Sequence, residues 1–192
     1  MKEERTFRAG KGGDGNDYGV VRLTGEANEK RRVRKKPCPT CPWRKDAEKG
    51  RFPADAFRSS ASTAYDASLT TFSCHEAGRE KIATCAGFVL ANSAHNMALR
   101  IDHIKGRYDP GKVKNPEGVE LFSDYREMAI ANGVNPEDPR IAPCRGDNED
   151  GMTVFERIRA SGYKPEYDGE AILRKARDED HDILMEKGKE DG

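Results

Sequence analysis

Four of the five cysteines in this chain lie within 48 consecutive residues, and this cluster constrains the fold more than any other feature. Cys38 and Cys41 form a Cys-x-x-Cys pair with a proline after each cysteine, and Cys74 and Cys85 follow. Two intervening residues allow a tight turn that directs both sulfurs at one ion, at about 2.3 Å for zinc. One pair supplies half of a tetrahedral site, so the other ligands must come from Cys74, Cys85 and the adjacent His75.

Several kinds of site fit these residue types at this spacing. The first is a structural zinc ion held by the four cysteines, or by a set in which His75 replaces one of them. The second is a 4Fe-4S cluster, since four thiolates satisfy either centre. A thioredoxin-like redox pair at Cys38 and Cys41 is less favoured, because a basic segment rather than a strand precedes it. The last is a set of scattered buried cysteines. We expect zinc, with the iron–sulfur cluster as the alternative.

Composition indicates that the core is small. Of the 192 residues, 35% are hydrophobic and 35% are charged, whereas ordinary domains have about 45–50% and about 25%. A chain of this length suits one domain with tails, and a structural metal adds folding free energy where the core is small. We therefore expect a mainly α fold (small α+β possible) with a metal-stapled, Cys-rich core, short helices and a disordered N-terminal arm.

Four segments are expected along the chain. The glycine-rich stretch 10–17 has no hydrophobic period, so disorder is expected around it, with one short strand at 18–23. The segments are a disordered basic arm at 1–36, a Cys-cluster metal-binding domain at 37–105, a helical extension at 106–163 and an acidic C-terminal helix or tail at 164–192. The formal net charge of the whole chain is zero, because 34 basic residues balance 34 acidic ones.

Hydrophobic periodicity and capping signals predict the helices. They are expected at about 52–67, 83–104, 124–132, 153–162 and 170–187. Pro53 suits a first helical position, because its missing N–H costs nothing there. Ser123 is the expected cap of the third helix, and Gly133 is the expected stop.

Six of the seven residues 30–36 are basic, just before the first cysteine. Such a block binds phosphates by releasing counterions, although a solvated basic linker is the simpler interpretation. If nucleic acid is bound, the contacts are expected at the basic residues of this block and just after the cysteine pair: Arg31, Arg32, Arg34, Lys35, Lys36 and Arg44.

Residues 37–46 (PCPTCPWRKD), 72–75 (FSCH) and 85–88 (CAGF) resemble an uncharacterised family scattered through bacterial and phage genomes. Its pattern is CPxCPWR, then FxCH, then CAG followed by Trp or Phe. The resemblance covers about residues 37–100. It implies that the cysteines and His75 act together and it supports a metal, but it implies no reaction. Phe88 stands here where many members have Trp, which is a conservative packing change.

The functional expectation is a small metal-binding protein that acts by binding nucleic acid or a protein partner. An iron–sulfur protein with a redox, sensing or enzyme-accessory role is the alternative. The sequence leaves open whether the protein is an enzyme, and it indicates no small-molecule substrate. No run of about 18 apolar residues is present, so the expected location is the cytoplasm, or the host cytoplasm if a phage encodes the chain. Cys144 stands apart and is expected to be a lone thiol.

Overall fold

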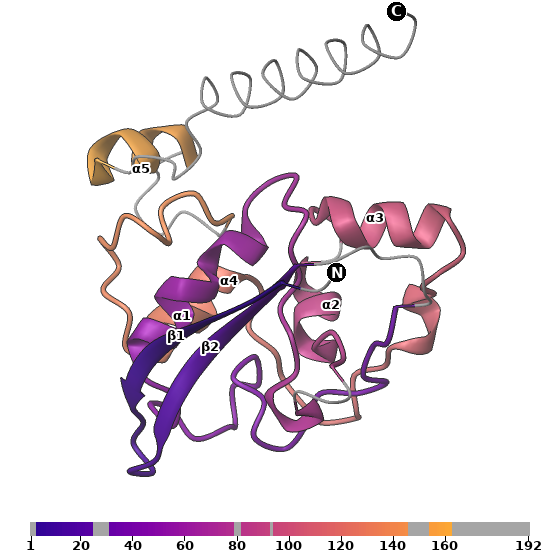
Figure 1. The fold of residues 1–192 in the computed structure, drawn as a ribbon, viewed down its shortest axis with the longest axis horizontal. Helices are drawn as coiled ribbons and strands as arrows, with labels where there is room; N and C mark the ends of the chain where they lie inside the picture. The colour runs from indigo at the N-terminus through magenta and orange to yellow at the C-terminus, as the bar shows by residue number, and fades with distance from the viewer. Residues whose placement is uncertain (1–2, 25–30, 79–81, 93, 146–153, 163–192) are drawn as a thin grey trace, which may run out of the picture. The chain divides into compact units, whose positions relative to one another are not determined.

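The computed structural model describes residues 3–24, 31–78, 82–92, 94–145 and 154–162 (Figure 1). Its elements are short, and each α-helix has seven or eight residues. In chain order they are β1 (Glu3–Lys11), β2 (Asp17–Thr24), α1 (Ala54–Ser60), η1 (Ala61–Ala64), η2 (His75–Ala77), α2 (Ala86–Asn92), α3 (Met97–Ile104), η3 (Pro110–Lys112), α4 (Tyr125–Ala131) and α5 (Val154–Ser161), where η marks a 3-10 turn.

The expectation of a mainly α fold is met only in part. Short helices are the commonest regular element of the described residues, but a two-stranded sheet accompanies them. None of the helices in this part of the chain has the length and the apolar character that crossing a lipid bilayer requires.

The N-terminal arm is not disordered as predicted, because residues 3–24 form an antiparallel hairpin. Its register pairs Glu3 with Thr24 and Lys11 with Asp17, and the expected strand at 18–23 lies within β2. The glycine-rich stretch that suggested disorder is the turn of this hairpin. The backbone N–H of Gly12 donates to the carbonyl of Asn16 at 2.9 Å.

The hairpin packs against the start of α1, beside which it lies in Figure 1. The backbone N–H of Gly13 donates to the carbonyl of Gly50 at 2.7 Å. Gly12 has to be glycine here, because a Cβ atom would lie 1.9 Å from the carbonyl oxygen of Arg51. The rings of Tyr18 and Phe52 meet edge to face at 5.2 Å. These contacts attach the predicted arm to the core.

The long helix predicted at 83–104 is two helices, α2 and α3. The side chain of Asn96 accepts a hydrogen bond from the backbone N–H of Leu99 at 3.0 Å, which starts a new helix at Met97. The helix predicted at 52–67 is α1 followed by η1. Pro53 is its N-cap, with extended backbone, rather than its first helical residue.

The third predicted helix is α4, and its cap differs by one residue from the prediction. Asp124, not Ser123, accepts a hydrogen bond from the backbone N–H of Glu127, at 2.8 Å. Ser123 instead donates its own backbone N–H to the Glu127 carboxylate at 2.8 Å, which completes a capping box. Gly133 follows the helix with φ +93°, as a stop residue does. The fourth prediction corresponds to α5.

One hydrophobic core joins the predicted metal-binding domain and the helical extension. Trp43 is fully buried in it, and its ring contacts those of Phe72, Phe88 and Tyr125, with centroids 5.8–6.2 Å apart. Because Tyr125 lies on α4, this extension has its apolar residues in the same core as the cysteines. Residues 1–162 form one compact unit, and the acidic helix predicted at 170–187 lies outside the described residues.

Candidate metal centre

A short hydrogen-bonded ladder centred on Thr84 holds the backbone around the cysteines. On one side, the N–H of Thr84 donates to the carbonyl of Arg32 at 2.8 Å, and the N–H of Arg34 donates to the carbonyl of Thr84 at 3.0 Å. On the other side, the N–H of Cys74 donates to Ala83 at 2.8 Å. The ladder therefore places the basic segment beside two of the cysteine-bearing segments.

Cys38, Cys41 and Cys74 lie at tight turns. The N–H of Cys41 donates to the carbonyl of Cys38 at 3.1 Å, which closes the Cys-x-x-Cys turn. Cys74 is the N-cap of η2, and its carbonyl accepts from the backbone N–H of Ala77 at 3.1 Å. These two turns fix the backbone at Cys38, Cys41 and Cys74.

The four clustered cysteines are buried and lie in continuous side-chain contact. Their residues are at most 5% exposed. Contacts run from Cys74 to Cys38, from Cys38 to Cys41 and from Cys41 to Cys85. The Sγ atoms of Cys41 and Cys85 are 3.6 Å apart. No disulfide joins any cysteine in the described part of the chain.

Hydrogen bonding among the sulfurs and burial raise the pKa values of Cys38 and Cys74. The hydrogen bond with Cys41 is the main cause that raises the pKa of Cys38, to about 11. The hydrogen bond with Cys38, together with burial, raises the pKa of Cys74. Without a metal the two thiols are therefore neutral at pH 7, and a metal ion that binds them must displace their protons.

His75 lies at the outer side of the cluster, next to Cys38. Its Nε2 atom is 3.9 Å from the Sγ atom of Cys38 and 2.9 Å from the hydroxyl oxygen of Thr40, which donates to the Glu76 carboxylate at 2.7 Å. Burial lowers the pKa of His75, and the ring of Phe52 packs 4.8 Å away. The ligand atoms of Cys38, His75 and Glu76 lie within 4.8 Å of one another, so these three residues form a candidate metal-binding group.

Two of the sulfurs are spaced as two ligands of one zinc ion would be. Zinc binds thiolates at about 2.3 Å in a tetrahedron, which places two sulfurs on one ion about 3.8 Å apart. The separation of 3.6 Å between the sulfurs of Cys41 and Cys85 is close to that value. Each thiolate of a 4Fe-4S cluster binds a different iron, so its sulfurs lie farther apart than two sulfurs on one ion.

Two of the six predicted nucleic-acid residues are engaged within the protein. The guanidinium of Arg31 pairs with Asp102, which is nearly fully buried, and also donates to Thr71. Arg44 pairs with Asp46 through two hydrogen bonds of 2.5 and 2.7 Å. Their charges are therefore largely neutralised.

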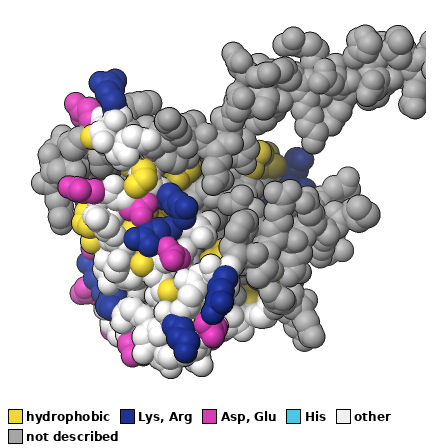
Figure 2. All heavy atoms as spheres, turned by 60° about the vertical axis from the view of Figure 1, so that its left-hand side comes forward, with side chains coloured by type: hydrophobic (Ala, Val, Ile, Leu, Met, Phe, Trp, Pro, Cys, Tyr) yellow, Lys and Arg dark blue, Asp and Glu magenta, His cyan; other side chains and the backbone are white. Residues whose placement is uncertain are grey.

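The other four predicted basic residues differ from these two. All are exposed, and the described part of the chain offers their side chains no ion-pair partner: Arg32, Arg34, Lys35 and Lys36. The face of the molecule shown in Figure 2 has basic and acidic side chains interspersed. Free positive charge is thus concentrated in a segment next to the cysteines.

The sequence predictions missed two polar residues of the centre. Thr40 lies inside the Cys-x-x-Cys turn, and Glu76 directly follows His75. Apart from these positions inside the motifs, nothing in the sequence around Thr40 or Glu76 indicates that either residue belongs to the centre. Their mutual hydrogen bond joins segments 36 residues apart in the chain, and only the fold brings these segments together. The thiol of Cys144 donates to the carbonyl of Ala61 at 3.6 Å.

Comparison with known protein families matches residues 33–145 to the family described as "Family of unknown function (DUF6283)". The chain belongs to this family. The predicted resemblance to an uncharacterised family is thereby confirmed, and the family region extends past the cysteine motifs to include α4 and Cys144. No curated protein and no solved structure matches the chain.

Proposed function

We propose that this protein binds one zinc ion through Cys38, Cys41, Cys74 and Cys85, and that the ion stabilises a module that binds a nucleic acid or a protein partner. The observation that carries the proposal is the set of four buried, contacting thiols without a disulfide. As ligands of one ion, the four thiolates would contribute directly to folding free energy.

His75 is proposed to act beside the ion rather than as a ligand. Its Nε2–H can donate to both Thr40 and the sulfur of Cys38, which are 2.9 and 3.9 Å away. Outer hydrogen bonds of this kind orient metal ligands and adjust their charge. With four thiolates available, a tetrahedral site is complete without the imidazole.

Zinc is preferred to an iron–sulfur cluster because of the sulfur spacing. The short distance between the sulfurs of Cys41 and Cys85 suits two ligands on a single ion. A closed four-thiolate site is typical of structural zinc, and it leaves no open position on the ion for a substrate. A closed site therefore supports a protein that acts by binding a partner rather than by converting a substrate at the ion.

Metal analysis after anaerobic purification tests the proposal. We expect about one zinc per chain and no absorption near 400 nm, because zinc has a filled d shell. Replacing Cys41 or Cys85 by Ser should abolish stoichiometric zinc. Cys144→Ser is the matched control, because this cysteine is equally buried but lies outside the cluster. A brown protein with stoichiometric iron and sulfide, or a folded protein without metal, would contradict the proposal.

A further inference from the structure

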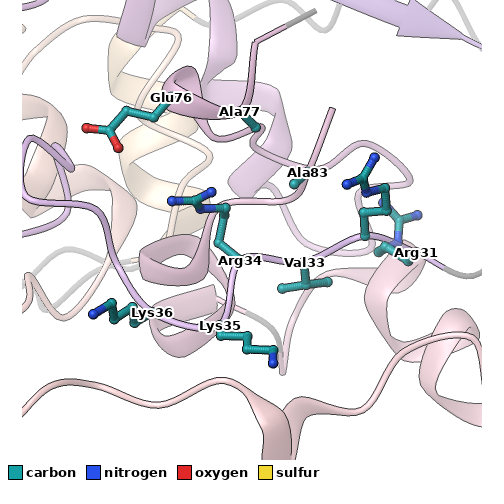
Figure 3. A pocket seen from close by; sticks show the side chains of 9 residues that line it. Arg31, Val33, Arg34, Lys35, Lys36, Glu76, Ala77 and Ala83 are labelled. Carbon is teal, nitrogen blue, oxygen red and sulfur yellow. The ribbon is translucent and has the colours of Figure 1, made fainter. Parts of the chain in front are cut away.

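A basic hollow lies beside the proposed metal centre. The segment 31–36 forms one wall, and Glu76, Ala77 and Ala83 form the other (Figure 3). In Figure 3 the side chain of Arg34 extends toward η2, where Ala77 and Glu76 lie.

The residues that line this hollow carry far more positive than negative charge. Arg31 is neutralised by Asp102. The four basic residues that follow it, 32 and 34–36, have no ion-pair partner among the described residues. Among the described residues that line the hollow, Glu76 is the single acidic side chain, and the Thr40 hydroxyl already donates to it. These described residues thus leave a net positive charge of about three for a ligand.

The backbone under these charges is held in place along its length. The N–H of Arg31 donates to the carbonyl of Arg107 at 3.0 Å, and the carbonyl of Lys35 accepts from Lys114 at 2.9 Å. Between them, Arg32 and Arg34 bond to Thr84 in the ladder. A solvated linker would have to be ordered when a ligand binds. This segment has its backbone ordered beforehand, so less conformational entropy is lost on binding.

We infer that this hollow binds the phosphate backbone of a nucleic acid. The inference rests on the proposed function, because zinc binding at Cys74 and Cys85 would stabilise the ladder that carries the segment. The hollow offers only Val33, Ala77 and Ala83 as apolar contacts. Protein interfaces gain much of their affinity from buried Trp and Tyr anchors, and the described residues that line the hollow include no aromatic side chain. Phosphate contacts need only cations, and they carry little sequence information.

Oligonucleotide binding to the full-length, zinc-loaded protein tests this inference. The probe is a fluorescent DNA single strand of about 20 nucleotides, with anisotropy measured between about 50 and 200 mM salt. The variant replaces Arg34, Lys35 and Lys36 by Ala. We expect affinity at least about tenfold lower at low salt, and a salt slope smaller by about 2, since each lost phosphate contact removes about 0.7.

The matched control replaces Arg100, Lys105 and Lys112 by Ala, which removes three positive charges from another exposed part of the protein. Its affinity and salt slope should stay near those of the parent. Equal losses in both triple variants, or no binding by the parent, would overturn the inference. So would tighter binding of a poly-glutamate peptide than of the oligonucleotide, which would assign the hollow to an acidic protein.

Zinc content separates this result from a failure of the proposed function. Stoichiometric zinc without oligonucleotide binding overturns the inference and leaves the metal centre standing. Oligonucleotide binding that depends on the hollow, in a folded protein without zinc, supports the phosphate site and contradicts the proposed metal function.

Discussion

Gly87 lies directly against Trp43: a Cβ atom at position 87 would be 2.5 Å from the Cβ atom of Trp43 and 3.1 Å from the sulfur of Cys41. Real atoms do not approach so closely, so the first turn of α2 can pack beside the metal centre only with glycine at this position. The third family motif, CAG followed by Phe or Trp, thus has a steric reason for its glycine.

Gly87→Ala should destabilise the protein. In an ordinary helix this change stabilises by up to about 1 kcal/mol. Here the extra methyl group must displace Trp43, and overpacking of this kind costs about 1–3 kcal/mol. Urea unfolding of the zinc-loaded protein measures the change. Gly111→Ala is the control, because its closest neighbour is a carboxylate oxygen of Asp109 at 3.2 Å. A stabilised Gly87→Ala variant would show that the packing is looser than described.

Asp102→Asn should strongly destabilise the fold. Asp102 is 2% exposed and pairs with both Arg31 and Arg107. Removing one member of a buried ion pair costs about 3–5 kcal/mol, because the remaining charge loses its partner. The control is Asp46→Asn. The side chain of Asp46 is 56% exposed where it pairs with Arg44, and exposed pairs contribute about 0–1 kcal/mol. Equal urea unfolding midpoints for Asp102→Asn and Asp46→Asn would contradict the prediction that only the buried pair contributes strongly to stability.

Thr40→Val should weaken zinc binding without unfolding the protein. Valine keeps the shape of threonine but removes the hydroxyl that links His75 to Glu76. Losing an outer hydrogen-bond partner typically costs about 10-fold to 100-fold in metal affinity, and we expect the lower end. Competition with a coloured chelator measures it. Thr70→Val, which changes an exposed hydroxyl near Ser68, should keep the parental affinity; if both variants bind zinc as the parent does, the network has no such role.

The metal-free protein should lose stability as the pH rises above about 9. An unperturbed thiol has a pKa near 9, whereas that of Cys38 in the folded chain is about 11. The folded state therefore holds this proton more tightly. Its contribution to the free energy of unfolding is complete below about pH 9 and disappears toward pH 11.

Sulfate strengthens burial, and it is added until the protein stays folded after a chelator has removed the metal. Thermal unfolding under these conditions measures the pH dependence. Cys38→Ser serves as the control, because it removes the raised pKa of Cys38 and should show a smaller decline. Constant or rising stability of the parent between about pH 9 and pH 11 would contradict the prediction.

The cysteine cluster was predictable because its signal is local. The Cys-x-x-Cys spacing requires a turn, and half a tetrahedral site requires further ligands. The sequence named four cysteines and His75, and the fold places Cys41 beside Cys85 and His75 beside Cys38. It could not show that Thr40 and Glu76 meet, since their contact joins distant segments.

Other features were missed for specific physical reasons. The composition of residues 10–17 resembles a disordered segment, but their glycines provide a hairpin turn and a close backbone contact with Arg51. The apolar residues keep their helical spacing past residue 92, so a single long helix was predicted and the separate helix that Asn96 caps was missed. Arg31 looked like a free cation because its partner, Asp102, is 71 residues away.

The ladder around Thr84 also affects how the protein is made on the ribosome. Its strands come from residues 32–34, 72–74 and 83–85, so the first lies about 50 residues from the last. A nascent chain that ends before Cys85 has three of the four thiolates and lacks the central strand. Closing such distant contacts delays folding. We therefore expect zinc to be captured only after Cys85 has left the ribosome, when the metal site and the wall of the basic hollow form together.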